Sequence, residues 1–385
     1  MYVLAIDLGS TFFKCATVDI DGEGRARIVR TVRVQVDQAK WSPGQGAARL
    51  EAAVRNLLGE AGKLVSEARP LAISLTGVRE GVAVIRKTGE LRLVLGSIEA
   101  MSWQMRHGDG WLAQVIAASK AKDAVVMSFA GWAGMLLTGR AAITNSELLS
   151  WRASPQAMAS EGPLALAARC LPEVVRVGEP LGRSSLFGGI PVAIAGTDEQ
   201  ASHWGAGLGL VATAEIAAST HWSLSRALDS PPPALPAHIR ILSAVDPYPV
   251  IGSYLGYRWG EYLSDIQQGR VPQVRDPLPP WSKSNFVQAL REGRCSSIQD
   301  ARALVRQDLH EGFRTLHPHE TSLEPPVIVH GGGSGPGSLV RAVIADLGWP
   351  ATFLQDNRQD DPTLLGGALV VAGTAGDLSG GAPSW

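Results

Sequence analysis

The first residues of the chain, Tyr2–Gly22, combine a side chain that could hold a metal ion with small residues that could hold an anion. The apolar run Val3–Ile6 ends at Asp7, and Gly9-Ser10-Thr11 follow almost at once. Small residues let backbone N–H groups approach an anion closely, and Asp7 could hold a hydrated Mg²⁺ through its water ligands. An ordinary β-hairpin with a glycine turn would contain the same residue types, so this stretch leaves both interpretations open.

A second polar group, Arg79-Glu80, comes after the short apolar run Leu71–Leu75. A continuous apolar run of this length is typical of a strand that is buried on both faces. Because ligands collect at the carboxyl ends of strands in open α/β sheets, we expect Asp7 and Arg79-Glu80 to line one cleft.

The second half of the chain repeats this pattern in outline. Ile190–Ile194 is a buried strand by pattern, and Gly196-Thr197-Asp198-Glu199-Gln200 follows it. Ser219-Thr220 forms another small-residue turn, and the glycine-rich stretch His330–Gly337 follows the strand Val327–Val329. This glycine cluster has neither the Lys-Ser/Thr of a Walker loop nor the spacing G-x-G-x-x-G. A flexible loop and a ligand-binding loop are both compatible with it.

The elements that must position these residues are strands and helices in alternation. Ala26–Val36 alternates β-branched and polar residues, which predicts a third strand after the opening hairpin. Apolar residues recur at helical spacing in Ala47–Ala68, which predicts one amphipathic helix. The middle of the chain, residues 108–183, has a mainly helical pattern, and Asp300–Leu316 and Thr363–Ala372 predict two further helices. This order indicates an α/β fold.

The composition excludes several classes of protein. The chain has 385 residues, 45% of them hydrophobic, which is enough for two sizeable cores. A formal net charge of −1 without a basic run argues against nucleic acid or an anionic membrane as a partner. Three widely separated cysteines indicate a reducing compartment, and the N-terminus has no signal-peptide pattern. The longest uncharged runs are shorter than the roughly 18–20 residues that a membrane span needs. We therefore expect a cytoplasmic protein.

Taken in order, the motifs resemble those of the FGGY family of carbohydrate kinases, within the actin-like ATPase superfamily. Ile6–Thr11 with Lys14 resembles the family's first phosphate motif, and Gly196–Gln200 resembles its catalytic-aspartate motif. Ala218–Trp222 is similar to the second phosphate motif, and Gly331-Gly332-Gly333 resembles the adenosine region. Each motif alone is weak, but several in the family's order make a specific match.

The resemblance implies an ATP- and Mg²⁺-dependent kinase that phosphorylates a hydroxyl group of a sugar, a polyol or a sugar-like small molecule. It makes Asp198 the general base, and it makes Asp7 and Asp198 the residues that organise Mg²⁺. The implied nucleotide-binding residues are Gly9, Ser10, Thr11, Lys14, Ser219, Thr220, Gly331, Gly332 and Gly333. Two structural alternatives are Asp198 as the N-cap of a helix and Lys14 as a solvated strand residue.

The acceptor site matches the family only in part. Arg79-Glu80 resembles the pair with which glycerol kinases and autoinducer-2 kinases hold substrate hydroxyls, so both residues are expected to bind the acceptor together with Asp198. The family's Asp-x-Arg substrate motif falls on Glu99-Ala100-Met101. Glu99 can accept hydrogen bonds from two hydroxyls, whereas Met101 cannot donate one. Either another group replaces the arginine, or the acceptor has an apolar portion there.

The implied architecture is two ribonuclease H-like domains, residues 1–206 and 207–385, with ATP held in an interdomain cleft. The second domain is shorter than is usual in the family, and the loss falls between Trp222 and Asp300. A catalytically degenerate nucleotide-binding relative and an actin-like ATPase with a non-sugar role are the alternatives. The resemblance is compatible with a homodimer, and the sequence does not fix the oligomeric state.

Overall fold

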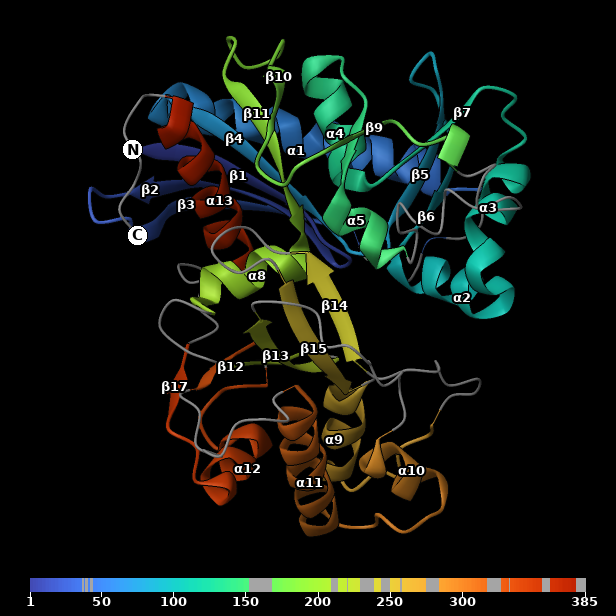
Figure 1. Ribbon diagram of the computed structural model, residues 1–385, viewed down its shortest axis with the longest axis vertical. Coiled ribbons are helices and arrows are strands. Elements are labelled where there is room, and N and C mark those ends of the chain that lie inside the picture. Colours follow the sequence, from blue (N-terminus) through green and yellow to red (C-terminus); the bar gives the residue numbers. More distant parts are fainter. Residues whose placement is uncertain are drawn as a thin grey trace. The chain divides into compact units, whose positions relative to one another are not determined.

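The structure is a computed structural model, and the chain divides into two compact units (Figure 1). The structure describes residues 1–36, 38, 41, 44–151, 168–208, 214–219, 221–228, 239–243, 250–256, 258–274, 284–316, 327–331, 333–354 and 361–378. Unit 1 is Met1–Gly205 together with Asp361–Trp385, and unit 2 is Ala206–Asp360. Each unit is built around its own six-stranded sheet.

The sheet of unit 1 has the strand order β10-β11-β4-β1-β2-β3. The neighbouring strands β11, β4 and β1 run parallel, and the pairs β10–β11, β1–β2 and β2–β3 are antiparallel. The strands are β1 (Tyr2–Leu8), β2 (Phe12–Ile20), β3 (Ala26–Gln35), β4 (Ala72–Gly77), β10 (Pro180–Arg183) and β11 (Pro191–Thr197). The carboxyl ends of the parallel strands therefore meet at one edge of the sheet.

Both faces of this sheet are covered, as the continuous apolar runs predict. Leu4 and Ile6 of β1 pack in one core with α1 (Gly46–Ala68) and α4 (Phe129–Thr138), because alternate side chains of a strand point to opposite faces. Val3 and Ala5 pack on the other face with α13 (Pro362–Leu378). In Figure 1 the red helix α13 lies on the near face of the sheet, and α1 lies behind it.

The region of residues 108–183 is less helical than the sequence pattern suggests. Its described residues form the helices α3 (Trp111–Ser119), α4 and α5 (Asn145–Ser150) and also the strands β7, β8, β9 and β10, whereas α2 (Ser97–His107), β5 and β6 precede the region. Strand β7 joins β5 in a three-stranded sheet of order β6-β5-β7, and β8 pairs with β9. These strands are β5 (Val82–Arg86), β6 (Leu91–Leu95), β7 (Ala124–Met127), β8 (Ala142–Thr144) and β9 (Glu173–Val175). Strands of three to five residues are too short for a period of two to show in the sequence.

Five strands of unit 2 repeat the topology of five strands of unit 1, while β10 of unit 1 and β14 of unit 2 have no counterpart in the other sheet. Its sheet has the order β14-β15-β13-β12-β16-β17, with β12, β16 and β17 parallel and the other pairs antiparallel. Strands β12, β16 and β17 thus correspond to β1, β4 and β11. The strands are β12 (Ala214–Ala218), β13 (Trp222–Leu228), β14 (Ile239–Ser243), β15 (Val250–Gly256), β16 (Val327–His330) and β17 (Ala351–Phe353).

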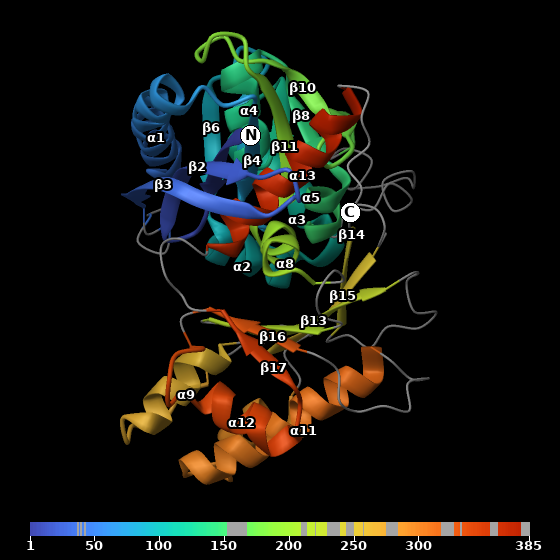
Figure 2. The same cartoon turned by 90° about the vertical axis from the view of Figure 1, so that its left-hand side faces the viewer.

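Helices cover one face of this second sheet (Figure 2). They are α9 (Trp259–Gln267), α10 (Asn285–Arg291), α11 (Ile298–Leu316) and α12 (Leu339–Leu347). Ala214, Ile216 and Ala218 of β12 point toward them in a common core. The repeated sheet with its covering helices is the ribonuclease H-like plan that was expected for both halves.

The last helix differs from the expected domain division. The expected second domain, residues 207–385, includes α13, whereas the structure counts α13 with unit 1. The reason is its packing, because Leu364 and Ala368 of α13 are buried with Val3 and Ala5 of β1. In the part of the chain that the structure describes, no helix is long and apolar enough to cross a membrane.

Candidate active site

The carboxyl ends of β1, β4 and β11 bring three of the predicted motifs together in unit 1. Asp7 lies opposite Thr76 in the parallel register of β1 and β4, and the Thr76 hydroxyl donates to Asp7 Oδ1 at 3.1 Å. Thr197 at the end of β11 lies opposite Gly77. Asp198 follows Thr197 directly, so Asp7, Arg79-Glu80 and Asp198 lie at one edge of the sheet, as expected from the strand ends.

Lys14 is an ion-pair partner rather than a solvated strand residue. It lies opposite Asp7 in the β1–β2 register, and its Nζ is 2.9 Å from Asp7 Oδ2 and 3.0 Å from Asp361 Oδ2. Only 17% of the Lys14 side chain and 2% of Asp7 are exposed. Burial alone would lower the pKa of Lys14, but the two carboxylates outweigh burial and raise it. The ammonium group thus stays charged and holds the start of α13 against the end of β1.

The turn Gly9-Ser10-Thr11 follows Asp7 closely. Gly9 is buried, and a Cβ at this position would lie 3.0 Å from the Phe12 carbonyl oxygen and 3.4 Å from Asp7 Oδ2. The turn therefore requires the small residue that the sequence has there. Ser10 and Thr11 are exposed at the end of the strand, where they are open to an anion.

Asp198 begins α8 (Asp198–Ala206) but does not cap it. The cap is Thr197, whose hydroxyl accepts a hydrogen bond from the Gln200 amide at 3.3 Å. Asp198 Oδ1 instead accepts from the Arg79 amide at 3.2 Å and from the Glu199 amide at 2.8 Å. The alternative in which Asp198 serves as the N-cap is therefore wrong.

The surroundings of Asp198 favour its protonated form. Burial raises its pKa first, the neighbouring carboxylates Asp7, Glu80 and Glu199 add to this, and Arg79 opposes it. The resulting pKa is about 8. A carboxylate whose pKa lies near neutrality is suited to accept a proton in general base catalysis.

Two carboxylates pair with the side chain of Arg79, and a hydrogen bond from a serine fixes its backbone carbonyl. Its guanidinium forms ion pairs with Glu80, at 2.7 Å, and with Glu199. The Ser150 hydroxyl donates to the Arg79 carbonyl at 2.7 Å. Sequence reasoning placed Arg79 and Glu80 at the acceptor site but gave no role to Glu199. The only signal for Glu199 was its position next to Asp198.

The helix α5 that carries Ser150 begins with a capping box. The Thr144 amide donates to Glu147 Oε2 at 2.8 Å, and the Glu147 amide donates to the Thr144 hydroxyl oxygen at 3.4 Å. Both residues are buried. Burial raises the pKa of Glu147, and the hydrogen bonds from Ser128 and Thr144 oppose that rise. The box fixes the start of α5 and hence the position of Ser150 beside Arg79.

Glu99 lies in the first turn of α2 and is half-buried. Burial raises its pKa, and Arg106 on the same helix opposes this. The same first turn contacts the acceptor pair, because the Ser97 hydroxyl donates to Glu80 Oε2 at 3.3 Å. Met101 is on the same helix and is half-buried as well.

In unit 2 the glycine-rich loop packs against the end of β12. The Gly333 amide donates to the Ala218 carbonyl at 2.8 Å, which places the loop beside Ser219. Gly331 has φ +94°, and a Cβ there would lie 2.7 Å from the same carbonyl oxygen. Both constraints require glycine at this position. The other two predicted residues of these motifs, Thr220 and Gly332, lie outside the described residues.

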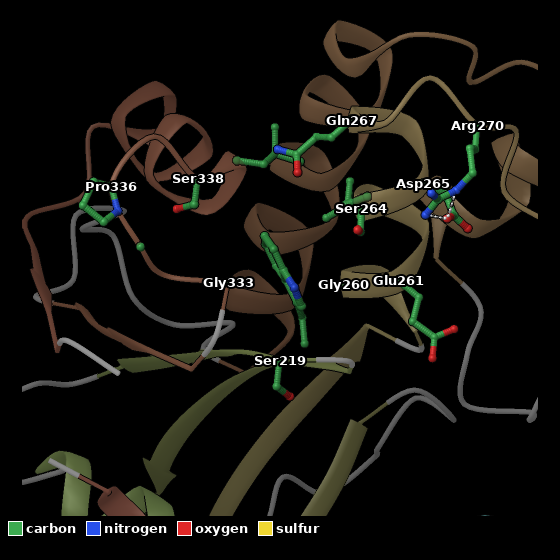
Figure 3. Close-up of a pocket in the computed structure, with 14 residues that line it drawn as sticks. Ser219, Gly260, Glu261, Ser264, Asp265, Gln267, Arg270, Gly333, Pro336 and Ser338 are labelled. Atoms are coloured by element: carbon green, nitrogen blue, oxygen red, sulfur yellow. Dashed lines mark hydrogen bonds and ion pairs between the residues drawn. The ribbon is translucent and has the colours of Figure 1, made fainter. Parts of the chain in front are cut away.

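A cavity of about 820 Å³ opens between this loop and α9 in unit 2 (Figure 3). Figure 3 shows Pro336 and Ser338 on one side, residues of α9 on the other, and Ser219 at the base. The lining residues are Ser219, Trp222, Gly260, Glu261, Leu263, Ser264, Asp265, Gln267, Arg270, Gly333, Gly335, Pro336, Ser338 and Leu339. The second phosphate motif and the glycine cluster thus border one cavity of the size that small-molecule sites have.

No family model and no curated protein matches this sequence. Solved structures do match the fold. A glycerol kinase with ADP from Plasmodium falciparum has a TM-score of 0.71 at 14% identity, covering 98% of this chain and 90% of that one. A xylulose kinase from Rhodospirillum rubrum has a TM-score of 0.69 at 15% identity, and the match covers 98% of this chain and 91% of the kinase. A gluconate kinase from Lactobacillus acidophilus has a TM-score of 0.68 at 11% identity, and the match covers 98% of this chain and 89% of the kinase.

The chain has the fold of the FGGY carbohydrate kinases. The predicted fold class and the resemblance are confirmed. The match extends over nearly the whole chain and about nine tenths of each kinase, so the shortening seen in the sequence removes no large part of the FGGY fold.

The charges at the predicted site of this FGGY fold suit a divalent cation that keeps its water ligands. Within the described ranges, no group of three or more His, Cys, Asp or Glu side chains is arranged to hold a metal ion by itself. Asp7 lies close enough to Asp198 to raise the pKa of Asp198, because the two carboxylates repel each other. A cation between them would relieve that repulsion, and Mg²⁺ is usually held by one or two carboxylates and several waters.

Proposed function

We propose that this protein transfers the terminal phosphoryl group of ATP to a hydroxyl group of a sugar, a polyol or a sugar-like small molecule. The observation that carries the proposal is the position of Asp198. Its carboxylate has a raised pKa and lies beside Asp7 and the Arg79-Glu80 pair, at the edge where the parallel strands end. This fold supports kinase chemistry in the proteins that it resembles.

Within unit 1 the residues divide the work. Arg79 and Glu80 would hold acceptor hydroxyls, since a guanidinium donates and a carboxylate accepts. Glu99, which lies on the helix that contacts Glu80, would accept from a further hydroxyl. Asp198 would take the proton of the attacking hydroxyl.

The metal and the first phosphate contacts belong to the same edge of unit 1. Asp7 and Asp198 would hold Mg²⁺ through water, and Mg²⁺, when bound, neutralises charge on the phosphates. Gly9, Ser10 and Thr11 would give backbone and hydroxyl donors. Lys14 would act on the phosphates from its place between Asp7 and Asp361, as a fixed positive charge near the metal.

In unit 2 the cavity would receive the adenosine and part of the phosphate chain. Ser219 and Gly333 line the cavity, and Gly331 holds the loop against β12. With them, Thr220 and Gly332 would complete the predicted nucleotide contacts. The similar fold of a glycerol kinase solved with ADP supports an adenine nucleotide as a ligand of this protein.

A second candidate is a nucleotide-binding relative that no longer transfers phosphate. The observation that favours it is Met101, which takes the place of a hydrogen-bonding arginine on α2 and gives an acceptor nothing to bond to.

ADP release from Mg-ATP across a panel of polyols, ketoses and aldoses separates the two candidates. Asp198→Asn should abolish acceptor-dependent release while an ATP analogue still binds, because the amide cannot take a proton. Glu51→Gln is the matched control, since the Glu51 carboxylate is 45% exposed on α1 and, among the described residues, pairs with Arg55 one turn later. Stimulation by no acceptor, with ATP analogue bound, would favour the second candidate. Full turnover by Asp198→Asn would remove Asp198 from the mechanism.

A further inference from the structure

The side chain of Gln38 joins the turn after β1 to the start of α2. It is buried, with 7% of the residue exposed, and its Nε2 donates to the Gly9 carbonyl at 2.9 Å. Its Oε1 accepts from the Ser97 amide at 3.2 Å, and its own amide donates to the Ser10 carbonyl at 3.0 Å. One amide side chain therefore uses both of its ends, one on the turn and one on the helix.

The start of α2 is shaped to receive this side chain. Gly96 precedes the helix with φ −70°, so no unusual backbone angle demands a glycine there. A Cβ at Gly96 would, however, lie 2.8 Å from Gln38 Oε1 and 3.0 Å from Gln38 Cβ. The glycine is needed because Gln38 comes so close, which makes the contact a specific part of the fold.

The connection continues from α2 to the acceptor pair. Ser97 receives Gln38 at its amide and donates from its hydroxyl to Glu80 Oε2 at 3.3 Å. The other carboxylate oxygen of Glu80 accepts from Arg79 Nε at 2.7 Å. A continuous series of hydrogen bonds thus runs from the Gly9-Ser10 turn through Gln38 and Ser97 to Glu80 and Arg79.

We propose that Gln38 is a positioning residue that couples the phosphate-binding turn to the acceptor-binding residues of unit 1. The inference rests on the proposed function, which gives the turn a phosphate and Arg79-Glu80 an acceptor. When an anion fixes the turn, the Gly9 carbonyl fixes the Gln38 amide, and the amide fixes the first turn of α2. Nucleotide binding then orders the acceptor residues before an acceptor arrives, which is a coupling between two sites of one unit.

Hydrogen exchange measured by mass spectrometry tests this coupling without turnover. The 385-residue chain is compared with and without a non-hydrolysable ATP analogue and Mg²⁺. In the wild type, the analogue should slow exchange both at residues 9–12 and at residues 97–101. In Gln38→Ala it should slow exchange at residues 9–12 only, and the effect at residues 97–101 should fall by roughly fivefold, as expected for one lost hydrogen bond.

Three further variants separate coupling from general damage. Gln38→Glu keeps an acceptor for the Ser97 amide but turns a carboxylate oxygen toward the Gly9 carbonyl, so it should also lose the response of α2. Gly96→Ala perturbs the same contact from the other side and should have the same effect. Trp41→Phe is the control. It removes the bond from Nε1 to the Val36 carbonyl, at 3.0 Å, and part of the ring that stacks on Phe129, but it leaves the side-chain contacts of Gln38 with Gly9 and Ser97 in place, so it should respond like the wild type.

The outcomes distinguish this inference from the proposed function. An undiminished response at residues 97–101 in Gln38→Ala would overturn the coupling, as would a wild type that binds the analogue without any response there. A wild type that binds no analogue would overturn both proposals. A full response of α2 in a protein that phosphorylates no acceptor would support the coupling and count against the kinase.

Discussion

Replacing Asp198 by asparagine is expected to make the protein more stable at neutral pH while it abolishes phosphoryl transfer. The pKa of Asp198 is raised from 3.8 to about 8, first by burial and then by Asp7, Glu80 and Glu199. A carboxylate with a raised pKa binds a proton more tightly in the folded state than in the unfolded chain. Above about pH 4 the carboxyl group ionises in the unfolded chain but keeps its proton in the folded state, so the raised pKa lowers stability progressively from about pH 4, and the full cost is reached near about pH 8.

The size of the effect follows from the shift. Between pH 3.8 and about pH 7 the stability cost of the raised Asp198 pKa grows by about 1.4 kcal/mol per pH unit, which gives about 4 kcal/mol at most. Asp198 is only partly buried, and solvent screens part of this cost, so about 1–3 kcal/mol is the expected gain. Asparagine keeps an oxygen that can accept from the Arg79 and Glu199 amides. For a unit of this size the gain corresponds to roughly 3–10 °C in Tm.

Thermal and urea unfolding of both proteins, measured without Mg²⁺ in EDTA from about pH 4 to pH 8, test the prediction. The stability difference should be small near pH 4 and should grow toward pH 8. Glu51→Gln should change stability by less than about 0.5 kcal/mol at every pH, because its carboxylate is exposed. An Asp198→Asn protein that is no more stable than the wild type at neutral pH, or whose gain is equally large near pH 4, would refute the argument.

Three further substitutions test other parts of the site. Lys14→Met should destabilise unit 1 by about 2–4 kcal/mol in urea titrations, because it leaves two carboxylates without their shared cation. Gly331→Ala forces a Cβ to within 2.7 Å of the Ala218 carbonyl oxygen at φ +94°, so it should destabilise unit 2 by about 2 kcal/mol or more and weaken ATP-analogue binding in calorimetry. Glu199→Gln removes one of the two carboxylates that hold Arg79, so KM for the acceptor should rise about tenfold while the Kd of an ATP analogue stays unchanged. An unchanged acceptor KM would show that Glu80 alone positions Arg79.

Much of the fold followed from local sequence pattern. The apolar runs before Asp7, Arg79 and Asp198 are strands in the structure, and the predicted helix Ala47–Ala68 is α1 with one more residue at its start. These predictions succeed because a strand buried on both faces has a continuous run of apolar residues, and a helix buried on one face has apolar residues that recur every 3.6 positions. The small-residue turns after the strands are likewise visible locally, since close approach excludes larger side chains.

The partners of the charged residues did not follow from local pattern. Lys14 pairs with Asp361, 347 residues away, and the side chain of Arg79 pairs with Glu199, 120 residues away. An isolated lysine on a strand looks the same in the sequence whether it faces solvent or two buried carboxylates. The sequence therefore left open the alternative of Lys14 as a solvated residue, and the two ion pairs in the structure show that it is wrong.

By itself the sequence determined the strands that precede Asp7, Arg79 and Asp198, the polar residues at their ends and the resemblance to the FGGY kinases. These depend on residue types within a few positions of one another, which the chain displays directly. Only the tertiary structure decided that Lys14 lies between Asp7 and Asp361, that α13 packs on the first sheet, and that Gln38 bridges the first turn and α2. Each of these depends on which distant residues come within hydrogen-bonding or van der Waals distance, and that is fixed only when the sheet and its helices pack together.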